Sequence, residues 1–255
     1  MDLHYRESGS GEPVIVLHGL FGTGDNWSAV GKALSESYRV LLVDAPNHGE
    51  SPWMDSMDYE AQASTVAGMI ESLGFDRARV VGHSMGGKTA MALALQRPEL
   101  VGTLVVVDIA PKRYEPSHGV ILDAMERVSE QKPETRREAD ALLADSGVEG
   151  SMVRAFLLKS YRTQGPQGPG WKLNLPVIRR DYQLLLGWPD FGGSVFDGSV
   201  NVLYGSLSSY VSEDDRQLLS RHFPSIAMRR IDGAGHWLHA EKPQATISAL
   251  FEMLQ

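Results

Sequence analysis

The chain has 255 residues, of which 42% are hydrophobic and 22% are charged, a balance typical of a soluble globular protein. Its formal net charge of −8 and its lack of a clustered basic segment argue against a nucleic-acid partner, because phosphate backbones are bound by grouped lysines and arginines. The sequence contains no cysteine, which excludes disulfides, thiolate metal ligands and a cysteine nucleophile.

Association with a membrane is not expected either. The sequence opens with Met1-Asp2-Leu3-His4, without the basic segment and apolar stretch of a secretory signal. Its longest apolar runs, such as Val14 to Leu17, are far shorter than the roughly 20 residues that span a bilayer. These features predict a soluble, cytoplasmic protein without a membrane partner, and they leave its oligomeric state open.

Six short runs rich in valine, isoleucine and leucine predict β-strands buried on both faces. In chain order they are Val14–Leu17, Arg39–Val43, Arg79–Gly82, Thr103–Val107, Val200–Tyr204 and Ile226–Ile231. Apolar residues at three- and four-residue spacing predict helices between them, at Tyr59–Leu73, Gly86–Gln96 and Gln244–Leu254. This alternation predicts an α/β fold whose mostly parallel sheet is covered by helices on both sides. In such folds, ligands bind at the carboxyl edge of the sheet.

The strand pattern stops between residues 112 and 195, where helical patterns dominate. The apolar positions that mark these helices are Ile121, Leu122, Met125, Val128, Ala141, Leu142, Val153, Phe156 and Leu157. Glycines and prolines at residues 165–170 predict a loop. We interpret residues 112–195 as a helical cap inserted into a core of residues 1–111 and 196–255. Ordinary surface helices are the alternative.

A G-x-S-x-G pattern centred on Ser84 lies directly after a predicted strand and directly before a predicted helix. This is the setting of a strained turn that exposes a nucleophilic serine at the edge of an α/β sheet. Glycine is expected at positions 82 and 86, because larger side chains there would collide with the neighbouring strand and helix. The pattern predicts that Ser84 is a nucleophile.

A serine hydroxyl needs a base within hydrogen-bonding reach. His236 lies in a glycine-rich loop between the last predicted strand and the last predicted helix, as expected in the chain order serine, acid, histidine. His239 is the main rival. His18 and His48 precede the nucleophile and are interpreted as stabilising turns, and His83 adjoins the nucleophile so that its side chain must point elsewhere.

The acid is not at its most common position. In many enzymes with such a nucleophile turn the acid follows the strand after the cap, but the corresponding residue here is Ser208. Asp108 instead ends the predicted strand after the nucleophile's helix, and we predict that it orients His236. Asp214 and Asp215 are the alternative, and they are otherwise interpreted as solvated residues in the first turn of a helix.

The transition state needs donors for its oxyanion. One is expected to be the backbone N–H of Met85, which follows the nucleophile, and the other the N–H of Leu20, with Phe21 as second choice. Gly19 and Gly22 in the same loop allow close approach of the backbone to a substrate, or simply form a tight turn.

Aromatic and leucine residues of the cap could form an apolar acyl or alcohol pocket, although such residues more often form the cap's own core. The candidates in the cap are Phe156, Leu157, Tyr161, Trp171, Tyr182, Leu185 and Trp188. As substrate-binding residues we predict Phe21, Phe156, Tyr161, Trp188 and Trp237. The expected chemistry uses no metal and no cofactor.

These motifs resemble the α/β-hydrolase superfamily, and within it the bacterial YbfF-type esterases and their mitochondrial relatives. The resemblance rests on Asp44, Ser51 and residues 18–22, 25–27, 47–49, 82–88, 107–111 and 235–243, and it covers the whole core. In that branch the acid is the aspartate of a D-I-[AS]-P stretch, which corresponds to Asp108. The resemblance implies hydrolysis of short acyl esters, with thioesters such as acyl-CoA included. The chain departs from the branch at residues 204–207, where details of the loop differ.

We therefore expect a serine esterase that acts on a small-molecule ester through a covalent acyl-enzyme. A carbon–carbon bond hydrolase or an acyltransferase of the same fold would keep the same triad. A ligand-binding module that hydrolyses nothing is a third alternative, since a fold alone does not prove activity. Epoxide hydrolases and dehalogenases of this fold use an aspartate nucleophile, so Ser84 argues against them.

Overall fold

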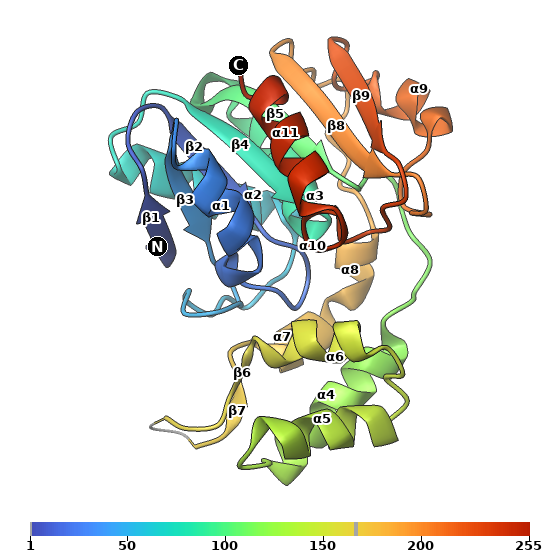
Figure 1. Cartoon of the computed structure of the whole chain (residues 1–255). Helices are drawn as coiled ribbons and strands as arrows, with labels where there is room; N and C mark the ends of the chain where they lie inside the picture. Colours follow the sequence, from blue (N-terminus) through green and yellow to red (C-terminus); the bar gives the residue numbers. More distant parts are fainter. Residues whose placement is uncertain (1, 166–167) are drawn as a thin grey trace.

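The structure is a computed structural model that describes residues 2–165 and 168–255. Within these residues the core is a seven-stranded sheet in the order β1-β3-β2-β4-β5-β8-β9, parallel except where β1 pairs with β3. The strands are β1 (Tyr5–Ser8), β2 (Pro13–Leu17), β3 (Arg39–Val43), β4 (Ala78–His83), β5 (Val101–Val107), β8 (Ser199–Gly205) and β9 (Ile226–Ile231). The predicted α/β fold with a mostly parallel sheet is confirmed (Figure 1).

Helices cover both faces of the sheet because its central strands are apolar on both faces. α1 (Ser28–Leu34) packs with α11 (Pro243–Met253) on one face, and α2 (Tyr59–Ser72) packs with α3 (Met85–Gln96) on the other (Figure 1). In β5, Val105 and Val107 join the first of these cores, and Leu104 and Val106 join the second. The shorter helices of the core are η1 (Gly24–Trp27), η2 (Pro98–Leu100), η3 (Glu213–Asp215), α9 (Arg216–Leu219) and α10 (Leu238–Glu241).

The two edges of the sheet differ from the expectation. β1 was not predicted, because it is a four-residue edge strand in which Arg6, Glu7 and Ser8 are exposed and no apolar run marks it. The prediction that β9 is buried on both faces is wrong. Since β9 pairs with β8 alone at the other edge, Ala227 and Arg230 reach the surface.

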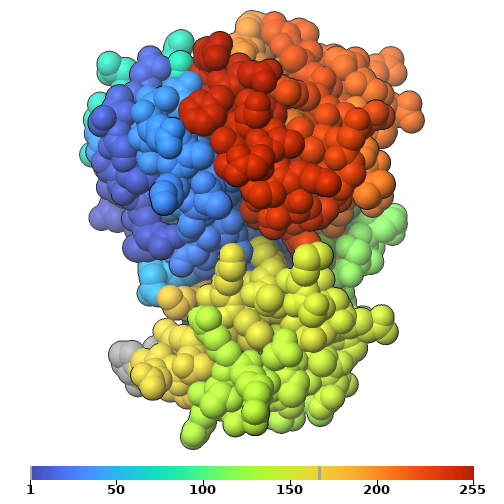
Figure 2. All heavy atoms as spheres, in the orientation of Figure 1, coloured from blue at the N-terminus to red at the C-terminus, as the bar shows by residue number. Residues whose placement is uncertain are grey.

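The described part of residues 112–195, a segment that we call the insert, lies beyond the carboxyl ends of the strands as a separate layer (Figures 1 and 2). Its elements are α4 (Gly119–Gln131), α5 (Arg136–Asp145), α6 (Ser151–Leu158), β6 (Tyr161–Arg162), β7 (Gly170–Trp171), α7 (Leu175–Arg180) and α8 (Tyr182–Leu186). The loop predicted over residues 165–170 includes Pro166 and Gln167, which lie outside the described residues. Gly170 belongs to β7 instead, where it pairs with Arg162. None of the helices in the described residues is long and apolar enough to cross a membrane.

Candidate active site

Ser84 occupies a strained turn between β4 and α3. Its φ of 52° lies in a region that residues other than glycine rarely adopt. A Cβ atom on Gly82 would lie 2.2 Å from the carbonyl oxygen of Gly86, and one on Gly86 would lie 2.5 Å from the carbonyl oxygen of Leu17. The turn therefore requires glycine on both sides of Ser84, as expected from the motif.

A chain of hydrogen bonds joins side chains from three strand ends. His236, in the loop after β9, has its Nε2 atom 3.0 Å from Oγ of Ser84. Its Nδ1 atom lies 2.7 Å from Oδ2 of Asp108, which follows β5. Because the carboxylate accepts a hydrogen bond from the N–H group at Nδ1, the lone pair of Nε2 faces the serine hydroxyl. The structure thus brings together the three residues predicted as nucleophile, base and acid.

The carboxylate of Asp108 is completely buried and has three donors around it. The amide of Gly205 donates to Oδ1 over 3.1 Å, and the hydroxyl of Ser208 donates to Oδ2, the oxygen that also faces His236. Such donors replace the water that a buried carboxylate has lost. The β8 loop, which lacks an acid of its own, therefore supplies two donors to the acid of β5.

The alternative acids do not approach His236. Asp214 is exposed, and Asp215 forms an ion pair with Lys112, whose Nζ lies 2.6 Å from its Oδ1. The interpretation of Asp215 as a solvated residue is wrong, because its side chain is buried against this lysine at the start of the insert.

The remaining histidines of the core have structural contacts. His239 is buried, and its ring stacks on Trp27 with a centroid distance of 4.6 Å, so it is not placed to act on the serine. Burial, together with the nearby charge of His236, lowers the pKa of His239 to about 4. His83 donates its Nε2 proton to the carbonyl oxygen of His236 over 2.8 Å. On His236 itself, the ring of Tyr210 stacks with a centroid distance of 3.8 Å, which restricts the tilt of the imidazole.

His18 fixes the peptide that carries the Leu20 amide. Its Nε2 atom accepts from the amide of Ala45 over 3.0 Å, so its proton is on Nδ1, which donates to the carbonyl oxygen of Gly19 over 2.8 Å. The amide of Gly22 donates to the same oxygen over 3.0 Å. Within the described residues no hydrogen bond engages the Leu20 amide, so it is available to a ligand.

The second-choice donor, the amide of Phe21, is already engaged. It donates to Nε2 of His48 over 3.3 Å, while Nδ1 of His48 donates to the carbonyl oxygen of Pro46 over 2.9 Å. Burial lowers the pKa of His48 to about 3, so the ring stays neutral and able to accept. This geometry favours the amide of Leu20 over that of Phe21 as the second oxyanion donor. The first predicted donor is the amide of Met85, which begins α3 and therefore has no acceptor within the helix.

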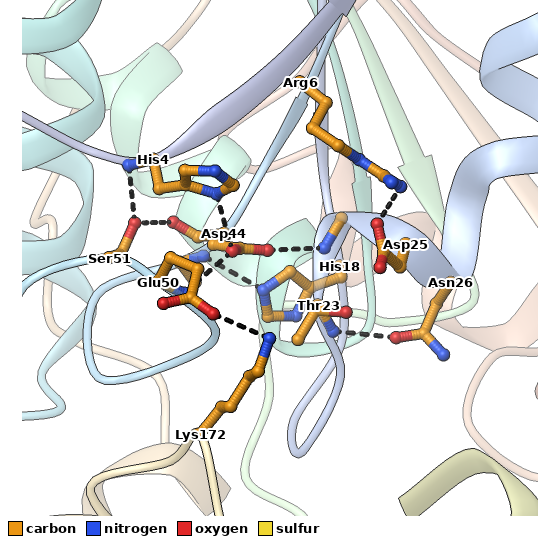
Figure 3. Close-up of polar contacts among 12 residues, drawn as sticks. His4, Arg6, His18, Thr23, Asp25, Asn26, Asp44, Glu50, Ser51 and Lys172 are labelled. Atoms are coloured by element: carbon orange, nitrogen blue, oxygen red, sulfur yellow. Dashed lines mark hydrogen bonds and ion pairs between the residues drawn. The ribbon is translucent and has the colours of Figure 1, made fainter. Parts of the chain in front are cut away.

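Asp44 connects the loop after β2, which contains Leu20 and Gly24, to the segment after β3 (Figure 3). Its carboxylate accepts from the amide of Gly24 over 2.8 Å and from that of Glu50 over 3.0 Å, and it contacts Nδ1 of His4 at 2.9 Å. Burial opposes the charge of Asp44, but these hydrogen bonds hold its pKa below the usual value. Glu50 in turn pairs with Lys172 of the insert, 2.6 Å away. The loop after β2 (residues 18–24), which carries the predicted oxyanion donor Leu20, is therefore joined by polar contacts to the segment after β3 and to the insert.

A cavity of about 680 Å³ lies between the core and the insert, and Ser84 and His236 open into it. The predicted substrate-binding residues Phe21, Phe156 and Trp237 line it, and the rings of Phe156 and Trp237 stack with a centroid distance of 5.6 Å. The other candidates of the insert that line it are Leu157, Tyr182 and Leu185. This volume is within the usual range of sites for small molecules.

Two of the predicted substrate-binding residues, Tyr161 and Trp188, lie outside the cavity, as does the further candidate Trp171. Tyr161 packs against Trp171 inside the insert and donates its hydroxyl proton to the carbonyl oxygen of Pro133 over 2.7 Å. Trp188 lies outside the cavity, with its ring near those of Tyr59 and Phe191. These rings build the insert and its junction with the core, so their assignment to the pocket is wrong.

The structure also adds cavity residues that the sequence did not single out, among them Tyr114, His118 and Tyr210. No motif marks them, because they come from two separate connections that only the fold brings together. His118 is held by Tyr182, whose hydroxyl lies 2.8 Å from its Nδ1. Burial, with the nearby charge of His236, lowers the pKa of His118 to about 4.

Comparisons with known proteins identify the family of the chain. A family model described as the alpha/beta hydrolase fold matches residues 12–243. The chain is 36% identical to the sn-1-specific diacylglycerol lipase ABHD11 of Danio rerio, over 97% of this chain and 80% of the relative. It is also 36% identical to esterase YbfF of Escherichia coli, over 93% of this chain and 91% of the relative. A solved structure of a marine microorganism esterase matches with a TM-score of 0.91 and 36% identity, covering 99% of both chains.

The chain therefore belongs to the α/β-hydrolase fold family. Within this family it falls in the branch of esterase YbfF, as its motifs indicated. The prediction of a carboxylic ester hydrolase is confirmed at the level of enzyme class, because the named esterases and diacylglycerol lipases all hydrolyse carboxylic esters.

Proposed function

We propose that the protein is a serine esterase in which Ser84 attacks the ester, His236 transfers protons and Asp108 orients His236. The observation that carries this proposal is the hydrogen-bonded series from Ser84 through His236 to Asp108, with its serine end open to the cavity. Residues 112–195 act as the cap over this site, residues 1–111 and 196–255 act as the core, and the cytoplasm is the proposed location.

In the first half-reaction, Oγ of Ser84 forms a bond to the ester carbonyl carbon while its proton passes to Nε2 of His236. The amides of Leu20 and Met85 donate to the oxyanion that results. When the tetrahedral intermediate collapses, the bond from carbon to the alcohol oxygen breaks and His236 protonates the departing alcohol. The acyl group remains on Ser84.

In the second half-reaction, water takes the place of the alcohol. His236 accepts a proton from the water as its oxygen attacks the acyl carbon, and the same two amides hold the second oxyanion. Collapse breaks the bond to Ser84, which recovers its proton from His236, and a carboxylic acid leaves. Throughout, Asp108 stabilises the positive charge of the imidazolium and does not become protonated.

We propose short-chain carboxylic esters as substrates, with acyl thioesters included. The cavity supports this class, because apolar side chains from both the core and the insert line it and its volume suits a small ester. The names of the relatives describe an esterase and a lipase that cleaves the sn-1 ester of diacylglycerol. Both activities need the same acyl transfer to water that is proposed here.

Labelling with a fluorophosphonate probe tests the nucleophile directly. The wild-type protein should be labelled and Ser84→Ala should not. Ser209→Ala is the matched control, because Ser209 also lines the cavity but has no contact with His236, and this variant should keep its labelling. A wild-type protein that stays unlabelled would favour a binding module without catalysis.

A substrate panel then separates the enzymatic alternatives. p-Nitrophenyl esters and acyl-CoA thioesters of graded chain length should be hydrolysed, with preference for short chains. Faster turnover of vinylogous diketo acids than of any ester would instead support a carbon–carbon bond hydrolase. Acyl products that form only when an alcohol acceptor is added would support an acyltransferase.

A further inference from the structure

Lys88 is a buried lysine one helical turn after the nucleophile. Only 1% of it is exposed, and no carboxylate among the described residues pairs with it. Its Nζ atom instead lies 2.9 Å from the carbonyl oxygen of Lys112, 3.1 Å from that of Leu186 and 2.5 Å from that of Gly187. An ammonium group has three N–H donors, so these three acceptors satisfy all of them.

The three acceptors belong to both connections between the insert and the core. Lys112 begins the insert, and Leu186 ends α8, immediately before the chain returns toward β8. The amide of Tyr114 also donates to the carbonyl oxygen of Leu186 over 2.9 Å, so the two connections run together at this point. A single side chain of α3 therefore holds the start of the insert and the end of its last helix against the core.

Burying the ammonium charge of Lys88 costs free energy that a neutral side chain would not. Burial lowers the pKa of Lys88 to about 7, with a smaller contribution from Arg113. The rings of Tyr114 and Tyr59 lie 4.9 and 5.4 Å from Nζ and partly offset this cost. A methionine would be easier to bury but would leave carbonyl groups of both connections without this donor.

The residues around the ammonium are also residues of the cavity. Tyr59, Tyr114, Leu185 and Leu186 line it together with the side chain of Lys88. The hydroxyl of Tyr59 adds a further bond to this junction, donating to the carbonyl oxygen of Leu185 over 2.7 Å. One wall of the cavity is thus formed by the segments that Lys88 joins.

We propose that Lys88 is a positioning residue that locks the two connections of the insert together and so sets the shape of the acyl-binding wall. It acts through that wall and not on the reacting atoms, because its three donors are already used. The inference rests on the proposed esterase function and adds a determinant of acyl specificity to it.

Steady-state kinetics of Lys88→Met with p-nitrophenyl acetate and p-nitrophenyl octanoate test this. With octanoate, KM should rise about tenfold or more, because a loosened wall no longer holds the chain. With acetate, kcat should stay within about threefold of wild type, because the triad and both oxyanion amides are on the core. An equal loss of kcat on both esters, or no change on either, would overturn the proposal. Lys32→Met, which removes an exposed lysine of α1, is the matched control.

Hydrogen exchange gives a readout that does not depend on ester hydrolysis. Amides of residues 112–118 and 182–188 should exchange faster in Lys88→Met than in wild type, while those of β4 and β5 should not change. Lys88→Gln keeps two N–H donors and should show a smaller effect in both measurements; it also replaces Lys88→Met if that variant does not fold. If hydrogen exchange of the amides at both connections is unchanged in a folded variant, the role proposed for Lys88 is refuted, whether or not the protein is an esterase. Failure of Ser84 labelling in the wild type would refute the esterase function alone.

Discussion

The hydroxyl of Ser208 donates to Oδ2 of Asp108, the same oxygen that lies 2.7 Å from Nδ1 of His236. Ser208 is in the loop after β8, at the position where many α/β hydrolases carry the acid itself. Here that loop has no acid and supports the one that follows β5. The amide of Tyr210 donates in turn to Oγ of Ser208 over 3.2 Å, which orients the hydroxyl toward the carboxylate.

Removal of this hydroxyl should weaken catalysis without abolishing it. In Ser208→Ala, Asp108 keeps His236 and the Gly205 amide but loses one donor, so kcat should fall about tenfold. The measurement is kcat and KM on p-nitrophenyl acetate, with Ser209→Ala as the neighbouring control. A kcat equal to that of wild type would show that the hydroxyl does not support the acid.

Loss of the acid itself should be far more severe. Asp108→Asn removes the charge that stabilises the imidazolium, and kcat should fall by about 10⁴, as in serine proteases. Asp214→Asn and Asp215→Asn are the controls, because neither carboxylate contacts His236, and both should keep kcat within about threefold of wild type. The acid assignment fails if Asp108→Asn hydrolyses p-nitrophenyl acetate at nearly the wild-type rate.

The position of Ser208 also allows the acid to be moved. In the double variant Asp108→Asn with Ser208→Asp, a carboxylate returns beside the imidazole from the β8 loop. Its kcat should exceed that of Asp108→Asn alone by about tenfold or more, because the new carboxylate at position 208 would stabilise the positive charge of the His236 imidazolium. No recovery in a double variant that folds like wild type would mean that the β8 loop cannot place an acid against His236.

The insert should contribute to the oxyanion loop through Ser160. This completely buried residue donates its hydroxyl proton to the carbonyl oxygen of Phe21 over 2.8 Å, and Phe21 has a φ of 64°. In Ser160→Ala that carbonyl loses a buried partner, so the loop should be less well ordered and kcat should fall about fivefold to tenfold, with KM nearly unchanged. Ser129→Ala removes a hydroxyl that bonds within α4 and serves as the control. A rise in KM with unchanged kcat would contradict this role.

Acid should destabilise the fold through its buried histidines. The folded-state pKa of His239 is about 4, below the ordinary value of 6.5, so the unfolded chain binds more protons between these limits. Stability is therefore complete above about pH 6.5 and falls toward pH 4, and His239 alone should cost about 2 kcal/mol between pH 7 and pH 5.

Urea unfolding at pH 7 and pH 5 measures this loss, and His239→Phe isolates the histidine. Phenylalanine keeps a ring against Trp27 and removes a buried Nδ1 that has no hydrogen-bond partner among the described residues. The variant should lose less stability than wild type on going to pH 5, while His48 and the other buried histidines still contribute. An equal loss in both proteins would refute the assignment to His239.

Much of the fold was predictable because its signals are local. The central strands are unbroken apolar runs. The G-x-S-x-G motif predicts a turn that places Ser84 at the carboxyl edge of these strands, and this prediction does not depend on the rest of the chain. Asp108 was found for the same reason, since it ends one of these runs. The edge strand β1 was missed because it is short and mostly exposed, so no apolar pattern marks it.

The cavity was predictable only in part. Phe156 and Trp237 line it, but Tyr161 and Trp188 are equally aromatic and pack elsewhere. An aromatic side chain has the same propensity for burial in a cap core as in a pocket wall, so composition cannot separate the two. Ser208 shows the same limit, since without a carboxylate it gave no sign of contact with the acid.

By itself, the sequence determined the order of the central strands and of the helices between them, the strained turn at Ser84 and the chain order of serine, acid and histidine, because these depend on periodicity, backbone sterics and residue type. The tertiary structure decided which side chains meet: the support of Asp108 by Ser208, the hold of Lys88 on the insert, and the division of aromatic residues between cavity and packing. Such contacts join residues far apart in the chain, and their distances depend on how the layers pack and not on local pattern.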